Sequence, residues 1–120
     1  SGGGWVVPAP MLKGVLGGCV LAILSGRESY GYEISERLEG YGFGRIAEGT
    51  VYPLLLRLER NGLIRADYRS SELGPRRKYY ALTQTGRAAL GDFLTHYRAL
   101  ERAVSRLIEE TEKLEVQADE

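Results

Sequence analysis

Three consecutive cations, Arg76, Arg77 and Lys78, follow a Gly-Pro pair and precede two tyrosines in the segment GPRRKYY at residues 74–80. A Gly-Pro pair favours a turn, so these cations are expected near the tip of a hairpin. Side chains alternate along a strand, so Arg76 and Lys78 share one face and Arg77 takes the other. Cations at an exposed tip are suited to a phosphate backbone or a narrow minor groove. A solvated surface loop is the alternative.

The second chemical feature is the start of a helix expected to run from about Ala47 to Asn61. The N–H groups of a helix N-terminus bind phosphate, and the hydroxyls of Thr50 and Tyr52 suit contacts with the DNA backbone or a base edge. We assign Glu48 to capping this helix. The alternative is structural: Thr50 caps the helix N-terminus, and the Tyr52 ring packs against the rest of the domain. Further along this helix lie Arg57 and Arg60. They are either additional DNA contacts or solvated surface residues.

Two further helices are expected before this one. Apolar residues recur at steps of three and four over residues 11–25, which predicts one amphipathic helix with a broad buried face. Ser29 is expected to cap the next helix, which ends in a glycine-rich stop at residues 40–44. The apolar stripe of that second helix is formed by Tyr30, Ile34 and Leu38, with Tyr41 behind them.

A hairpin is predicted to follow, with strands at residues 63–69 and 77–83 and a loop at residues 70–75. Three helices followed by a two-stranded ribbon form the order of a winged helix-turn-helix, with the third helix as the recognition element and the hairpin loop as the wing. The fold class expected is therefore mainly α with a small β-hairpin.

A long helix capped by Thr83 or Thr85 completes the chain, and its heptad-like apolar seam is longer than the face of one domain needs. We interpret residues 84–120 as a dimerisation helix and residues 11–83 as the DNA-binding domain. Residues 1–10 are interpreted as a linker or a cloning-derived segment. The seam is assigned to Leu90, Leu94, Tyr97, Leu100, Val104 and Leu107.

Sixteen basic and sixteen acidic residues give the chain no formal net charge, but the two signs are distributed unevenly. Residues 57–87 hold eight cations and three anions, a net of +5, whereas residues 101–120 hold three cations and seven anions, a net of −4. The basic middle is consistent with a nucleic-acid partner.

Cysteine and histidine are each present once, as Cys19 and His96, which argues against a zinc site and a Cys–His or Ser–His catalytic pair. No other pairing of nucleophile and base is present, so no enzymatic activity, metal or cofactor is expected. Single-cysteine usage is typical of a reducing compartment, and we expect a cytoplasmic protein.

The chain resembles the PadR family of bacterial transcriptional regulators over residues 11 to about 104. The resemblance depends on several short motifs in the correct order, MLKG at residues 11–14, YGYEI at 30–34, EGTVYP at 48–53, RLE at 57–59, GLI at 62–64 and GPRRKYY at 74–80, followed by LT at 82–83 and GR at 86–87. It implies a homodimer that represses transcription by binding palindromic promoter DNA and is released by a small molecule. It also implies that Tyr30 and Tyr32 lie near the DNA backbone.

Two positions depart from the family pattern. Leu56 stands where many relatives carry a polar or basic residue, which predicts an exposed leucine or a local change of helix face. Tyr97 stands where ligand-binding relatives place a tryptophan, so it is either a smaller stacking surface for an effector or a residue of the dimer core. Leu56 and the neutral total charge motivate an alternative function, a winged-helix module for protein interaction or ligand sensing that does not bind an operator.

Overall fold

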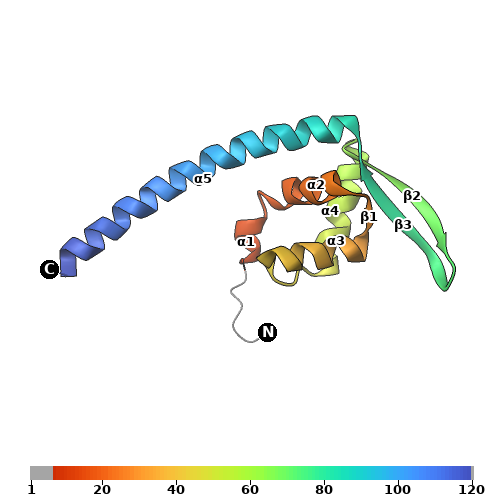
Figure 1. The fold of residues 1–120 in the computed structure, drawn as a ribbon, viewed down its shortest axis with the longest axis horizontal. Coiled ribbons are helices and arrows are strands. Elements are labelled where there is room, and N and C mark those ends of the chain that lie inside the picture. The colour runs from red at the N-terminus through yellow and green to blue at the C-terminus, as the bar shows by residue number, and fades with distance from the viewer. Residues whose placement is uncertain (1–6, 120) are drawn as a thin grey trace. The chain divides into compact units, whose positions relative to one another are not determined.

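The structure, a computed structural model, describes residues 7–119 and is mainly helical with one small antiparallel sheet (Figure 1). The expected fold class is therefore confirmed. The chain divides into two compact units between Leu90 and Gly91. Within residues 7–119, no helix combines the length and the apolar character that crossing a membrane requires. The part of the predicted linker at residues 1–6 lies outside the described residues.

The first predicted helix is two helices, α1 (Ala9–Leu12) and α2 (Leu16–Gly26). The prediction of one helix over residues 11–25 was wrong because Gly14 lies between them, and glycine is a poor helix former. Pro8 precedes α1 as its N-cap, so the helix includes the end of the predicted linker. The periodicity still identified the buried face, since Leu12 and Leu16 are both buried.

The core of the first unit lies among α2, α3 (Gly31–Leu38) and α4 (Glu48–Arg60), with one side closed by the sheet. Each helix contributes residues at steps of three and four, as an amphipathic helix packed on one face requires. The apolar side chains with almost no exposure are Val20, Ile34, Leu38, Val51, Leu55 and Ile64.

A short strand that the sequence analysis missed, β1 (Ser29–Tyr30), precedes α3 and pairs with β3. Two residues are too few to produce a visible alternation. Ser29 is not the cap that was predicted: its hydroxyl is buried and accepts a hydrogen bond from Arg37 at 3.0 Å. Glu33 fulfils the capping role, because its carboxylate accepts the Tyr30 N–H at 3.3 Å.

The predicted glycine-rich stop lies at the end of α3, where the chain passes through one wide turn, η1 (Glu39–Phe43). Gly42 and Gly44 have φ of +107° and +81°, a backbone region that side chains other than glycine rarely adopt. Tyr41 was predicted to lie behind the apolar stripe, but it is 76% exposed because η1 turns it away from the core.

The hairpin strands β2 (Ile64–Ser71) and β3 (Gly74–Leu82) are longer than predicted, and together they form the wing (Figure 1). The tip is Glu72 and Leu73, and Gly74-Pro75 belongs to β3 rather than to the loop. A register shift near the tip, between Arg69 and Ser71, accompanies this arrangement. The sheet order is β1-β3-β2, so β3 is the central strand.

The last helix, α5 (Gln84–Asp119), begins at the predicted cap, since the Thr83 hydroxyl accepts the Gly86 N–H at 3.0 Å. Leu90 packs partly against the core of the first unit. In the second unit the other seam residues are exposed, from 38% for Leu94 to 69% for Leu107.

Candidate nucleic-acid interface

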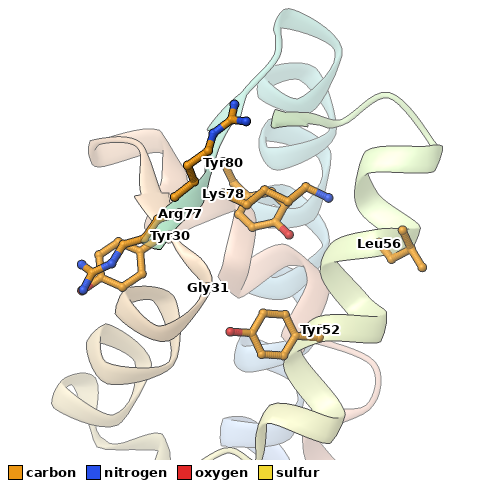
Figure 2. Close-up of a pocket in the computed structure, with 8 residues that line it drawn as sticks. Tyr30, Gly31, Tyr52, Leu56, Arg77, Lys78 and Tyr80 are labelled. Carbon is orange, nitrogen blue, oxygen red and sulfur yellow. The ribbon is translucent and has the colours of Figure 1, made fainter. Parts of the chain in front are cut away.

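An open cleft of about 460 Å³ lies between the wing and α4 in the first unit (Figure 2). It brings together residues from four elements, β1, α3, α4 and β3. We call it the wing–helix cleft, and it is lined by Tyr30, Gly31, Tyr52, Leu56, Arg76, Arg77, Lys78 and Tyr80.

The α4 side of the cleft is an exposed helix face with little polarity. Tyr52 and Leu56 are 45% and 52% exposed, and Pro53 between them is also exposed. Leu54, Leu55 and Leu58 take the opposite face into the core. The helix is regular through Leu56, so of the two predictions for that residue the exposed leucine is correct.

The N-terminus of α4 has no side-chain cap. Ala47 is the N-cap residue, so neither Glu48 nor Thr50 performs the capping that the sequence suggested. The backbone N–H groups of Thr50 and Val51 bond to the Ala47 carbonyl at 2.9 and 3.2 Å. The N–H groups before them receive no side-chain cap, which leaves them available to an anion.

The cations of the wing lie on two faces of the ribbon, as strand alternation predicts. The Arg77 guanidinium lies over the ring of Tyr30, 4.4 Å from its centroid. The Arg76 guanidinium lies over the ring of Tyr68 at 5.4 Å. Among residues 7–119, neither arginine has a carboxylate within 4.0 Å, so both present uncompensated charge.

Lys78 differs from these arginines because its charge is already paired within the protein. Its ammonium donates to the Glu59 carboxylate of α4 at 3.1 Å. This hydrogen bond raises the pKa of Lys78 above its ordinary value, which stabilises the charged ammonium. The pair joins the wing to α4. The sequence predicted Lys78 as a cation of the hairpin tip that contacts DNA, and the role of Glu59 as its partner was missed.

The cleft contains only some of the predicted contact residues. Tyr30, Tyr52, Arg76, Arg77 and Lys78 line it. Tyr32 is 54% exposed and lines a separate hollow between α3 and the start of α4. The remaining predicted contacts are exposed on α4 without lining the cleft: Thr50, Arg57 and Arg60.

Gly31 lines the cleft, and the sequence analysis did not identify it as a site residue. It is the first residue of α3, and a Cβ built on it would lie 2.7 Å from Cε1 of Tyr52. The absence of a side chain at Gly31 lets the Tyr52 ring lie against α3 in the cleft (Figure 2). The only local feature that could have indicated its role is a glycine at the start of a helix. That feature is a weak indication, because glycine is also common at the start of helices that have no functional site.

Tyr97, the candidate ligand contact, lies in the second unit and is 39% exposed. Its ring stacks with that of Phe93, with 5.9 Å between centroids and 29° between planes. The two rings present a joint aromatic surface on α5.

The sequence and the structure of this chain are similar to those of known proteins. The family model described as "Transcriptional regulator PadR-like family" matches residues 20–92. The crystal structure of a PadR-like transcriptional regulator from Bacillus cereus is 44% identical, with a TM-score of 0.76 over 83% of this chain and 97% of that one. A Streptococcus transcriptional regulator is 42% identical, with a TM-score of 0.73 over 83% of this chain and 98% of that one. Transcriptional regulator Rv3488 of Mycobacterium tuberculosis is 36% identical over 68% of this chain and 71% of its own length.

Proposed function

Since this chain belongs to the PadR-like family of transcriptional regulators, whose members bind DNA and are not enzymes, we propose that it is a homodimeric repressor of palindromic promoter DNA. The observation that carries the proposal is the wing–helix cleft. It combines an exposed face of α4 with two uncompensated arginines of β3 in one compact unit. Residues 11–83 form the DNA-binding part and residues 84–120 the dimerisation part.

In this proposal α4 enters the major groove, and its uncapped N-terminus faces a phosphate. Arg76 and Arg77 contact the phosphates beside that groove, from the two faces of the wing. Lys78 holds the wing against α4 through Glu59 and supplies a further positive charge. Tyr30, Tyr32, Thr50, Tyr52, Arg57 and Arg60 complete the proposed contact set.

Dimerisation is proposed through the seam of α5. Most of the stability of a helix in a protein comes from packing its apolar face against a partner. An exposed apolar stripe on a lone helix lacks that packing, so we expect a partner to cover it. Exposed seam residues from Leu94 to Leu107 supply such a stripe. A two-fold axis would then place two α4 helices in successive major grooves, about 34–36 Å apart.

Regulation by a small molecule is proposed at the same seam. The stacked rings of Phe93 and Tyr97 supply a flat surface for an aromatic effector. An effector bound between two α5 helices would change the angle between the subunits. The spacing of the two wings, and with it the DNA affinity, would change as well.

The experiment that tests the proposal is fluorescence anisotropy with DNA from upstream of the gene for this protein, at two salt concentrations, beside a scrambled duplex of equal length. Tight, salt-sensitive binding with a preference for the promoter duplex supports operator binding. Lower output from that promoter in transcription with added protein supports repression. Absence of binding to both duplexes at low salt would instead support the protein-interaction module.

A further inference from the structure

Leu56 is an exposed leucine in the middle of the recognition helix. It is 52% exposed, whereas Leu54, Leu55 and Leu58 on the same helix are buried. It lies four residues, about one turn, beyond Tyr52 and lines the same cleft (Figure 2). Its side chain has no hydrogen-bonding group, so any recognition at this position operates through apolar contact.

The surroundings of Leu56 indicate what that contact is. The cleft that it lines also holds Arg76 and Arg77, neither of which is paired with a carboxylate of the described residues. An occupant that fits must present negative charge at its edge and an apolar group beside the helix. The major groove of DNA does both, because phosphates border it and the 5-methyl of thymine is its apolar group.

We propose that Leu56 contacts the 5-methyl group of a thymine in each half of the binding site and thereby determines part of the sequence specificity. The inference rests on the proposed function, since it requires α4 to lie in the major groove. Cytosine lacks this methyl group and presents an amino group at its edge, which leucine cannot accept. Leu56 therefore favours thymine over cytosine at this base pair.

The test begins with selection of bound duplexes from a random pool by the full chain. Each thymine of the selected duplex is then replaced by deoxyuridine, which removes the 5-methyl group and keeps the base pairing. We expect one such position per half-site to weaken binding about fourfold, the effect of one buried methyl group. Deoxyuridine elsewhere in the duplex serves as the DNA control.

Variants of Leu56 then assign the effect to this side chain. L56A and L56Q should bind the thymine and deoxyuridine duplexes with equal affinity. L56M keeps an apolar side chain and should retain the preference for thymine. Because the position is half-exposed, each variant is expected to fold, and circular dichroism checks this. Either L56A or L56Q suffices to decide the assignment.

Three results would overturn the inference. If no thymine position is sensitive to methyl removal in the wild type, or if the sensitivity persists in L56A and L56Q, Leu56 does not read a methyl group, and operator binding still stands. If the full chain binds no DNA at all, the proposed function fails together with the inference.

Discussion

Tyr52 of α4 lies against Gly31 of α3, so closely that a Cβ at Gly31 would lie 2.7 Å from Cε1 and 3.1 Å from Cζ of the tyrosine ring. This contact joins the two helices of the helix-turn-helix at the cleft itself. Gly31 is buried, whereas Tyr52 is 45% exposed. The buried glycine therefore determines the position of a tyrosine ring that is partly exposed to solvent.

Replacement of this glycine should therefore affect DNA binding more than stability. In Gly31→Ala the methyl group displaces the Tyr52 ring, whose exposed end can move, so the free energy of unfolding should change by less than about 1 kcal/mol. Losing one positioned contact should weaken DNA binding about fivefold. Urea unfolding and fluorescence anisotropy measure the two effects. Gly40→Ala is the control, because a Cβ there meets nothing within 4 Å; equal DNA affinity in both variants would contradict the role of Gly31.

A second glycine, Gly86, should show the opposite balance. A Cβ at Gly86 would lie 2.0 Å from the Leu63 carbonyl oxygen, which is backbone and cannot rotate away. Gly86→Ala should therefore lower the free energy of unfolding by about 3 kcal/mol, as overpacking against a rigid neighbour does. Urea unfolding followed by circular dichroism provides the measurement. A loss no larger than that of Gly40→Ala would mean that the start of α5 shifts freely.

The wing cations should differ in how they affect the salt dependence of DNA binding. Arg77→Ala removes an uncompensated charge and should lower the slope of log affinity against log salt by about one. Lys78→Ala should lower it less, because the charge that it removes is already opposed by Glu59. Glu59→Gln should strengthen binding at low salt by releasing the lysine charge.

Anisotropy titrations at several salt concentrations measure these slopes, with Lys13→Ala as a control cation between α1 and α2. Identical slopes for the Arg77 and Lys78 variants would show that the ion pair with Glu59 opens when DNA binds.

The seam of α5 should tolerate no added charge. Val104→Lys places an ammonium in the proposed dimer contact, where the two copies repel each other and lose solvation. We expect a monomer by sedimentation equilibrium and a DNA affinity at least about a hundredfold lower, because two linked half-sites are no longer bound together. Ala99→Lys, placed on the opposite face of the heptad pattern, should remain a dimer. A dimeric Val104→Lys would place the interface elsewhere.

Local patterns in the sequence predicted most of the fold. Leu54, Leu55 and Leu58 follow helical spacing, and Thr83 begins the last helix as its cap. The predictions that were wrong depended on information from outside the local window. β1 forms only because β3 pairs with it. Gly74-Pro75 lies in a strand because strand pairing shortens the predicted loop of residues 70–75 to Glu72 and Leu73.

The candidate site divides in the same way. By itself the sequence determined the order of the main helices and of the two wing strands, the cations of β3 and the alternation that separates Arg76 from Arg77, because helix and strand periodicity are properties of neighbouring residues. Only the tertiary structure decided that Glu59 holds Lys78, that Gly31 lies beneath Tyr52 and that Leu56 faces the same cleft as the arginines. These pairings join residues that are distant along the chain, and packing of the helices and the sheet around one core sets which of them meet.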